Sequence, residues 1–488
     1  MKKTTLKRLI CVLAALVMLG SVFAACAGNG GNDKQTKETE QKEHPYMQDD
    51  GLPDKKYDGD TVTYLTATEI TGGELTVMDI EDSDDPLLTS LYRRTKYVED
   101  RFNVDVVDNR RPYTLTYETI WTGVNSNDGS FDACYGFIAY MFPLALEGCF
   151  IEFNEVPYID VTREWWDQNA REAFTVANKL FYLTGDANMF YNDYTWVLFF
   201  NKDIMKDIQE DAPYDSVRKG TWTLDKMYNM GLKARYDVNG DSVYDKAEDR
   251  FGMVTHQYTA NALLYGSNEL FFEKDENDEP FITFENSRVI DVCEKVEKFF
   301  KTAGYMYDTT NGNGNGMGIQ EKFAADEALF AGEVLQCARR YRGMTTDFGI
   351  LPYPKYDEEQ KNYVTYSLEM VYPVGITKNM VGADLERVGI VTEALQSASI
   401  NSLYKAYFDA ALTSARFLRD DESEEMLKII FETRCFPLAT MKDFGGVAGK
   451  FAYAVRKATG GYSSLVARFK SMAEGEIQET LEAIDKIK

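Results

Sequence analysis

The sequence predicts an α/β protein with two lobes, and two observations carry this prediction. From about residue 57, short apolar strands alternate with amphipathic helices, a pattern typical of an α/β domain with a mostly parallel sheet. About 430 residues follow the N-terminal segments, and a single hydrophobic core stops growing at roughly 250 to 300 residues. We therefore expect the chain to divide into two lobes.

The first lobe begins with a strand, a helix and a second strand. Residues 61–66 favour a strand, and residues 87–102 carry apolar side chains at helical spacing. Two further strands are predicted at residues 103–107 and 131–135. Because strands and helices alternate in this order, neighbouring strands are expected to run parallel.

A second set of elements begins near residue 197. The predicted elements are a strand at 197–200, helices at 223–235, 287–303 and 319–331, and a strand at 333–337. Residues 311–316 alternate asparagine and glycine, which disfavours helix and strand and predicts a loop.

The first 25 residues have the pattern of a secretory signal peptide. Basic residues precede an apolar stretch at residues 9–20, and Ala24 and Ala25 stand directly before Cys26. The apolar stretch is shorter than the ~20 residues that a membrane-spanning helix needs. The segment is therefore expected to target the protein and to belong to neither lobe.

The residues around Cys26 resemble the lipobox of bacterial lipoproteins, in which the cysteine thiol is acylated, for example with palmitate, and becomes the mature N-terminus. Phe23 departs from the pattern, since leucine is commonest there. The alternative is an ordinary signal peptide with an incidental cysteine. Residues 26–56 then form a tether whose composition cannot bury a core. This interpretation places the protein on the extracellular face of the cell membrane, attached only through its lipid.

The charge balance excludes several classes of partner. The formal net charge is −26, and removal of a signal peptide with four basic and no acidic residues takes it to about −30. Such a charge disfavours binding of nucleic acid and of anionic lipid. It does not identify a ligand.

Five cysteines follow Cys26, and their spacing matches no metal motif or disulfide framework. They are Cys134, Cys149, Cys293, Cys337 and Cys435. Buried free thiols are the expected state, and a bridge between Cys134 and Cys149 is the main alternative.

Several local motifs, in this order, resemble extracellular solute-binding proteins of carbohydrate ABC importers, the family that includes maltose-binding protein. The motifs are Leu198-Phe-Phe-Asn-Lys-Asp203, Gly220-Thr-Trp-Thr-Leu-Asp225, Phe330-Ala-Gly-Glu333, Phe348-Gly-Ile-Leu-Pro-Tyr-Pro354 and Val374-Gly-Ile-Thr-Lys378. Each motif is weak alone, and the resemblance covers nearly all of the mature sequence.

The resemblance implies a type II periplasmic-binding-protein fold, with a hinge between the lobes and a ligand cleft that closes by hinge bending. It implies a first lobe of residues 57–190 and about 365–425, a second lobe of about 191–364, and C-terminal helices from about 426 to 488 that pack across both. It also implies a monomer that carries a carbohydrate to the transmembrane subunits of an ABC permease without catalysis, and the expected carbohydrate is an oligosaccharide.

Residues 237–248 have the spacing of an EF-hand calcium loop. Oxygen ligands stand at Asp237, Asn239, Asp241, Asp245 and Glu248, and Val243 would supply its carbonyl. Ser242 occupies the position where glycine is expected, so it would need a left-handed backbone conformation. The alternative is a solvated acidic turn. No cofactor other than this structural Ca²⁺ is predicted.

Sugar sites combine aromatic rings, which pack on C–H faces, with polar groups that bind hydroxyls. Placed in the implied layout, the candidate ligand residues are Tyr135, Phe137, Tyr194, Trp196, Arg340, Tyr341, Tyr366, Glu369 and Tyr453. For each of them, ordinary packing or surface placement remains the alternative. Trp121 is a further candidate, whereas Trp165, Trp166 and Trp222 are expected to pack in the protein.

Two other functions remain open at this point. A lipid-anchored glycoside hydrolase needs only two suitably spaced carboxylates, and the chain has 79 acidic residues. His256 is the only histidine after the tether, which disfavours most metal-hydrolase and Ser-His-Asp sites. A glycan sensor or adhesin would bind without transport.

Overall fold

The computed structural model describes Tyr46 and residues 48–68, 85–188, 190–244, 249–309, 317–367, 370–407 and 421–487. Cys26, the predicted signal peptide, most of the predicted tether and the predicted loop at 311–316 lie outside these residues. Within the described part of the chain, no helix is long and apolar enough to cross a membrane.

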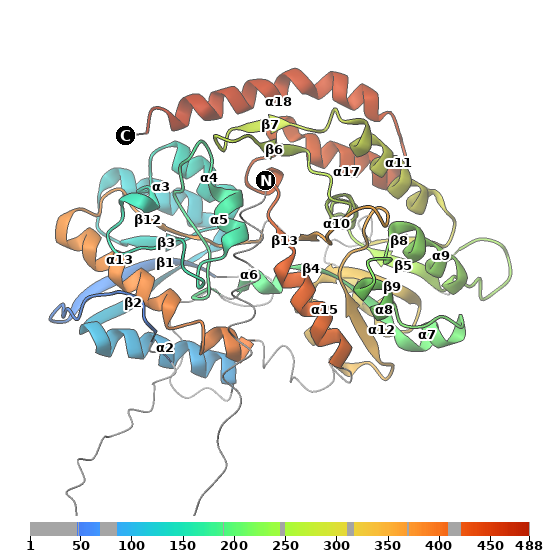
Figure 1. Ribbon diagram of the computed structural model, residues 1–488, viewed down its shortest axis with the longest axis horizontal. Helices are drawn as coiled ribbons and strands as arrows, with labels where there is room; N and C mark the ends of the chain where they lie inside the picture. Colours follow the sequence, from blue (N-terminus) through green and yellow to red (C-terminus); the bar gives the residue numbers. More distant parts are fainter. Residues whose placement is uncertain are drawn as a thin grey trace, which may run out of the picture. The chain divides into compact units, whose positions relative to one another are not determined.

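The first lobe is built on a four-stranded sheet with the order β12-β3-β1-β2 (Figure 1). The central strand β1 (Asp60–Thr68) pairs in parallel with β2 (Val104–Pro112) and with β3 (Ala133–Tyr135). The edge strand β12 (Val374–Ile376) comes from late in the chain and runs antiparallel to β3. The prediction of a mostly parallel sheet is therefore confirmed.

Helices cover this sheet, and α2 illustrates why they form. Asp85 caps its N-terminus by accepting from Leu87 N, and Asn103 ends it in a left-handed conformation. Its buried face carries Leu91, Val98 and Phe102 at helical spacing. The helices of this lobe are α2 (Pro86–Phe102), α3 (Thr116–Ser126), α4 (Ile138–Leu146), α5 (Gln168–Phe174) and α13 (Gly382–Ser397).

The second lobe contains a five-stranded sheet with the order β10-β4-β9-β5-β8. This sheet is mixed: β5 is parallel to β8 and β9, whereas β4 is antiparallel to β9 and β10. All six residues of β4 are buried. The strands are β4 (Trp196–Asn201), β5 (Phe251–Thr255), β8 (Met306–Asp308), β9 (Ala328–Val334) and β10 (Phe348–Leu351).

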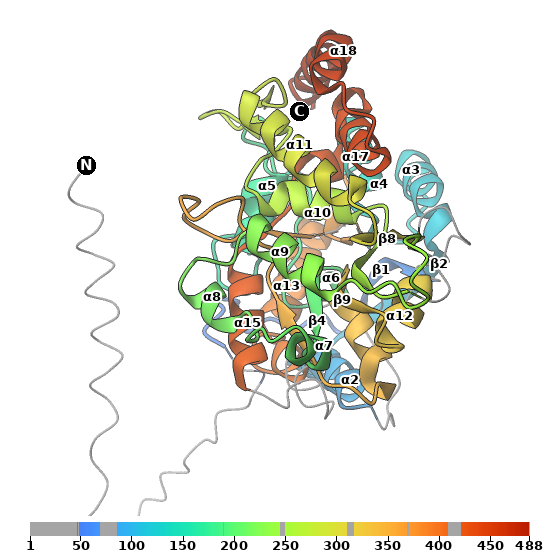
Figure 2. The ribbon, with the colours of Figure 1, turned by 90° about the vertical axis from the view of Figure 1, so that its right-hand side faces the viewer.

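Figure 2 views the second lobe from its outer side, with several of its helices in the foreground. Trp222 precedes α9, is fully buried, and donates from Nε1 to the Pro352 carbonyl at 3.0 Å, so its predicted packing role is confirmed. The helices are α7 (Lys202–Asp207), α8 (Tyr214–Arg218), α9 (Leu224–Ala234), α10 (Thr259–Gly266), α11 (Ser287–Lys301) and α12 (Met317–Ala324).

The prediction was wrong for one stretch of this lobe. The expected helix at 319–331 ends with α12 at Ala324, and the expected strand at 333–337 is instead the end of β9 followed by the 3-10 helix η4 (Leu335–Gly343). Residues 328–331 are buried on both faces of the sheet. A continuous apolar run of this kind fits helix and strand equally well, so periodicity could not place the boundary.

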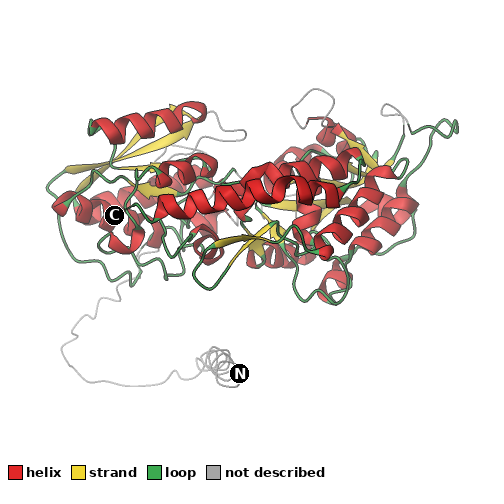
Figure 3. Cartoon of the chain, turned by 90° about the horizontal axis from the view of Figure 1, so that it is seen from above, coloured by secondary structure: helices red, strands yellow, loops and turns green. Residues whose placement is uncertain are grey.

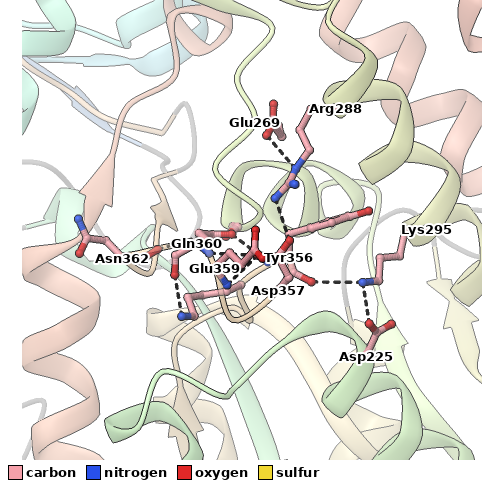
Figure 4. A network of polar contacts seen from close by, with 11 residues as sticks. Asp225, Glu269, Arg288, Lys295, Tyr356, Asp357, Glu359, Gln360 and Asn362 are labelled. Atoms are coloured by element: carbon pink, nitrogen blue, oxygen red, sulfur yellow. Dashed lines mark hydrogen bonds and ion pairs between the residues drawn. The ribbon is translucent and has the colours of Figure 1, made fainter.

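The loop after β10, which contains Tyr356 and Gln360, is held against α11 by a network of polar contacts (Figure 4). The Tyr356 ring lies between two cations of α11, with Arg288 4.0 Å and Lys295 4.2 Å from its centroid. Gln360 accepts from Tyr356 N at 2.9 Å, and Arg288 also pairs with Glu269 and Asp357. These contacts give the loop a fixed path back toward the first lobe.

The C-terminal helices contact both lobes. Figures 1 and 3 show α18 running from the side of α11 and α17 toward α4, and α18 contacts both α11 and α4. Helix α15 packs on β10 and α8, so residues 421–425 lie against the second lobe, although the sequence analysis assigns them to the first. These helices are α15 (Asp421–Glu432), α16 (Leu438–Met441), α17 (Val447–Lys457) and α18 (Tyr462–Ile484).

Candidate functional site

Among the described residues, three chain segments that connect the two lobes lie side by side. The first crossing contains the helical turn α6 (Phe190–Asp193) and leads directly into β4. The second contains β11 (Thr365–Tyr366), and the third contains β13 (Arg434–Cys435), which pairs with β11 in parallel. A β-bridge joins Thr195 to Ser367. The residues at these segments are therefore fixed relative to both sheets.

A row of aromatic rings lies at the end of the first lobe that adjoins the crossings. Phe137, directly after β3, contacts Tyr140 at 5.1 Å and Tyr372 at 5.9 Å between ring centroids. Tyr117 extends the row from α3, 5.9 Å from Tyr140. Tyr117, Phe137 and Tyr140 are half-buried, so part of each ring remains accessible.

Tyr372 joins this row to the first crossing. Asn188 Nδ2 donates to the Tyr372 carbonyl at 2.6 Å. Burial raises the pKa of the Tyr372 hydroxyl, and the nearby Tyr194, Tyr113 and Tyr140 add to the shift. Tyr372 Oη is buried without a hydrogen-bond partner among the described residues.

The second lobe contributes rings and charges at the carboxyl ends of β5 and β8. Trp196 lies 6.4 Å from Tyr258, and His256 lies 5.5 Å from Tyr258, between ring centroids. Arg456 of α17 donates to Asp308 at 3.3 Å. Burial lowers the pKa of His256, and the neighbouring Arg456 lowers it further. His256 is therefore neutral near pH 7, so it can both donate and accept a hydrogen bond.

Polar side chains also lie at the end of β9 and on η4, which follows it. Burial raises the pKa of Glu333 to about 7, and its carboxylate accepts from Cys337 Sγ at 3.4 Å. Arg340 is exposed, and its Nη1 donates to Gln320 Oε1 at 2.9 Å. Arg340 therefore presents its charge at the surface of the second lobe, beside a neutral partner.

The name crossing site is used here for Phe137, Tyr140, Tyr194, Trp196, His256, Tyr258, Tyr372 and Arg456. It combines three half-buried rings, Phe137, Tyr140 and Tyr258, with three buried rings, a neutral imidazole, and Arg456, which pairs with Asp308. Such a set suits a ligand with apolar C–H faces and many hydroxyls.

The structure distributes the predicted ligand residues over several environments. Phe137, Tyr194 and Trp196 belong to the crossing site. Tyr453 is 56% exposed on α17, one turn before Arg456. Glu369 lies outside the described residues.

Three predicted tyrosines are buried by packing. Tyr135 contacts Tyr64 at 5.8 Å, and Tyr366 in β11 contacts Tyr265 at 5.0 Å. Tyr341 lies in a core cluster of the second lobe, 5.1 Å from Phe199. These tyrosines were predicted from their position in the layout that the family resemblance implies, and such a layout does not distinguish core tyrosines from ligand platforms.

Sequence analysis missed Tyr140, Tyr258, Tyr372, His256 and Arg456. A signal for two of them was present, because His256 directly follows a strand and Arg456 stands one turn after Tyr453. Tyr372 enters the site through a crossing whose path only the tertiary structure defines.

The tryptophans outside the crossing site behave in two ways. Trp165 and Trp166 are buried, and their indole nitrogens donate to the two carboxylate oxygens of Glu393 at 2.8 and 2.9 Å. Their expected packing role is confirmed. Trp121 is 44% exposed on α3, one turn after Tyr117 of the aromatic row.

All five cysteines of the lobes are free thiols, four of them buried and Cys435 half-buried. The alternative bridge between Cys134 and Cys149 is therefore not formed.

In the described part of the calcium-like loop, side-chain oxygens accept hydrogen bonds from backbone amides of the same loop. Asp237 accepts from Gly240 N and Ser242 N, both at 2.7 Å, and Asp241 accepts from Val243 N at 2.7 Å. Ser242 has a φ of 65°, the left-handed conformation that the sequence predicted for this position. Asp245 and Glu248 lie outside the described residues, and within the described part no group of three or more metal-binding side chains occurs.

Comparison with known proteins identifies the fold. No protein-family model matches this sequence, and no curated protein matches it. The sugar-binding protein MalE from the phytopathogen Xanthomonas citri matches the structure with a TM-score of 0.56 at 13% identity, over 88% of this chain and 97% of that one.

Two further structures match similarly. A cyclo/maltodextrin-binding protein complexed with maltotetraose has a TM-score of 0.55 at 12% identity, over 88% and 98% of the chains. An ABC substrate-binding protein from Listeria monocytogenes in complex with cycloalternan has a TM-score of 0.52 at 12% identity, over 87% and 100%. The chain therefore has the two-lobe α/β fold of ABC-importer sugar-binding proteins, the fold that its sequence predicts.

Proposed function

We propose that this protein binds a carbohydrate outside the cell and delivers it unchanged to the transmembrane subunits of an ABC importer. The crossing site carries this proposal, because it offers half-buried aromatic rings of both lobes together with His256 and the half-buried Arg456–Asp308 pair. The fold supports it, since sugar-binding proteins of ABC importers share this architecture. Tyr117, Phe137 and Tyr140 of the aromatic row are half-buried and offer more than one ring for stacking, which favours an oligosaccharide.

The direct test is a thermal-shift screen of residues 26–488 against mono- and oligosaccharides. A ligand at a hundred times its Kd stabilises the folded state by about 2.7 kcal/mol. In calorimetry with the best sugar, Tyr140→Ala should weaken binding about 5- to 10-fold through loss of ring stacking, since Tyr140 is a half-buried ring of the crossing site. Tyr236→Ala is the matched control, because Tyr236 is 59% exposed on the second lobe and outside the crossing site. No shift with any sugar would contradict the proposal.

The alternatives are separated by two further measurements. A glycoside hydrolase would cleave its bound oligosaccharide, whereas a transport protein returns it intact, as chromatography of the incubated sugar would show. A sensor or adhesin would bind equally well, but deletion of the gene would leave uptake of the sugar unchanged. Loss of uptake supports import.

The membrane anchor is proposed to be a lipid on Cys26. Labelled palmitate should enter the wild-type protein and should be absent from Cys26→Ser, which should also be released into the medium. Label on the variant would contradict the assignment. The signal-peptide pattern supports this proposal, and the lipid would keep the lobes beside the permease.

A structural Ca²⁺ is proposed for residues 237–248. Asp237, Asn239 and Asp241 supply side-chain oxygens within one short loop, the ligand type of a hard cation, and Ca²⁺ would rigidify this loop of the second lobe. Millimolar Ca²⁺ should raise Tm, Mg²⁺ should do so less, and Asp237→Asn should abolish the difference. An equal effect of both ions on wild type and variant would favour the solvated acidic turn.

A further inference from the structure

One β-hairpin of the second lobe extends beyond the sheet of that lobe. Strands β6 (Phe272–Lys274) and β7 (Pro280–Ile282) pair only with each other among the described strands. The hairpin lies between α10 and α11 in the chain, and Figure 1 shows it passing beneath α18. Its base is anchored by Phe272, which contacts Phe284 at 5.9 Å and Phe444 at 5.2 Å.

The tip of this hairpin contacts the first lobe. Ala177 N donates to the Asp278 carbonyl at 2.9 Å, and Asn178 Nδ2 donates to the Asn277 carbonyl at 3.0 Å. Residues 175–178 follow α5, and a few residues later Leu183 forms a β-bridge with Val374 of the first-lobe sheet. The hairpin therefore joins the lobes away from the three crossings.

Lys274 makes the strongest part of this junction. Its Nζ donates to the carbonyls of Thr175, at 2.6 Å, and Glu172, and it pairs with Asp278 at 3.0 Å. The side chain is only 12% exposed. Because both carbonyls belong to the C-terminal end of α5, this lysine of the second lobe caps a helix of the first.

The backbone on both sides of the junction is strained. Ala177, Asn178 and Asp278 have φ angles of 48°, 58° and 58°, in the left-handed region that L-residues rarely adopt. Strained turns persist where surrounding contacts hold them. Here each turn is closed by its own backbone hydrogen bonds, between Val176 and Lys179 and between Asp275 and Glu279, and it receives further hydrogen bonds from the opposite lobe.

The junction is also narrow. Behind the tip, a cavity of about 420 Å³ separates α5 from the hairpin and β13, and it is lined by Asn169, Ala173, Phe272, Glu273, Cys435 and Leu438. The hairpin and residues 172–178 therefore meet through a few hydrogen bonds, and the Lys274–Asp278 ion pair lies within the hairpin itself. A small set of partly exposed contacts can open and close reversibly.

We infer that the β6–β7 hairpin is an interlobe strap. Its tip holds residues 172–178 and thereby sets the resting angle between the lobes. The tip is released from residues 172–178 when the lobes separate. The strap limits opening, so that ligand enters a partly closed protein. This inference does not depend on which ligand binds, and its test needs none.

The test measures local opening and lobe separation together in residues 26–488. Hydrogen exchange of peptides containing Ala177 reports the tip, and spin labels at Glu118→Cys and Asp203→Cys, with Cys435→Ser, report the distance between lobes. Lys274→Met removes the cation and keeps the side-chain length. Lys219→Met is the matched control, since Lys219 is an exposed lysine of the second lobe paired only with Asp215 among the described residues.

In Lys274→Met, the amide of Ala177 should exchange at least 10-fold faster than in the wild type, and the distribution of distances between the spin labels should broaden toward longer values. Lys219→Met should change neither the exchange rate nor the distance distribution. Asn178→Gly keeps the left-handed backbone but loses the side-chain donor, so it should show the same effects at smaller size. It also serves as the second variant if Lys274→Met does not fold. Faster exchange with an unchanged distance distribution, or an unprotected Ala177 amide in the wild type, would overturn the strap.

Discussion

The guanidinium of Arg339 and the carboxylate of Asp193 form a two-pronged ion pair, with Nη1–Oδ1 and Nη2–Oδ2 distances of 3.2 and 2.6 Å. Tyr407 donates to the same carboxylate at 2.7 Å, and Asp193 is 2% exposed. Asp193 ends α6 in the first crossing, whereas Arg339 lies on η4 of the second lobe. The pair therefore fixes η4 against the crossing, directly beside Tyr194.

Asp193→Ala should lower the free energy of unfolding by about 2 to 4 kcal/mol, because Arg339 and Tyr407 lose their shared acceptor. Urea unfolding of the wild type and variant measures the difference. Asp203→Ala is the control: Asp203 pairs with Lys206 in mostly exposed surroundings, so its loss should cost less than about 0.5 kcal/mol. A similarly small effect of Asp193→Ala would show that the pair does not hold the crossing.

Stability should fall as the pH rises, because burial raises the pKa values of Glu333 and Glu393 to about 7. The folded state binds these protons more tightly than the unfolded chain does. Their stabilisation is therefore complete below the ordinary glutamate pKa of about 4.3 and is lost as the pH passes about 7. Between pH 5 and pH 8 the two groups together should reduce the unfolding free energy by a few kcal/mol, on the order of 1 to 3 for each.

Glu393→Gln tests this assignment, since glutamine does not titrate. The variant should be less stable than the wild type at pH 5, because one indole of Trp165 or Trp166 loses its acceptor, but its stability should decline less toward pH 8. An unchanged slope would mean that Glu393 does not carry the pH dependence.

Two glycine-to-alanine changes in helices should have opposite effects. At Gly389 in α13, an added Cβ would lie 2.2 Å from the Pro157 carbonyl oxygen, a backbone atom that cannot move aside. Gly389→Ala should therefore destabilise by about 1 to 3 kcal/mol despite the better helix propensity of alanine. At Gly475 in α18 nothing lies within 4 Å, and Gly475→Ala should stabilise by about 0.5 to 1 kcal/mol. Thermal unfolding of both variants gives the comparison.

Thiol reactivity should single out Cys435. The other four cysteines of the lobes are buried, whereas Cys435 is half-buried and lines the cavity beside the strap. Its reaction should be slow, because desolvation raises its pKa to about 12 and the thiolate is the reactive form. Mass spectrometry after labelling of the native protein should find one slow site, absent in Cys435→Ser. Rapid labelling of Cys134 or Cys293 would contradict the burial of these thiols.

The sequence by itself determined the α/β class and most of the elements. The strand at 61–66 and the helix at 87–102 appear as β1 and α2, because their apolar spacing follows the period of each structure. The left-handed Ser242 was also predictable, since the loop spacing requires it. These features depend on residues close together in the chain.

Only the tertiary structure decided which residues meet at the crossing site. Tyr372 and Phe137 are more than two hundred residues apart, and their rings meet because β12 pairs with β3. Tyr341 and Trp196 are both buried in core clusters, yet Tyr341 contacts Phe199, whereas Trp196 contacts the half-buried Tyr258 at the site. Long-range pairing of strands fixes these positions, and periodicity within one segment contains no information about the partner strand.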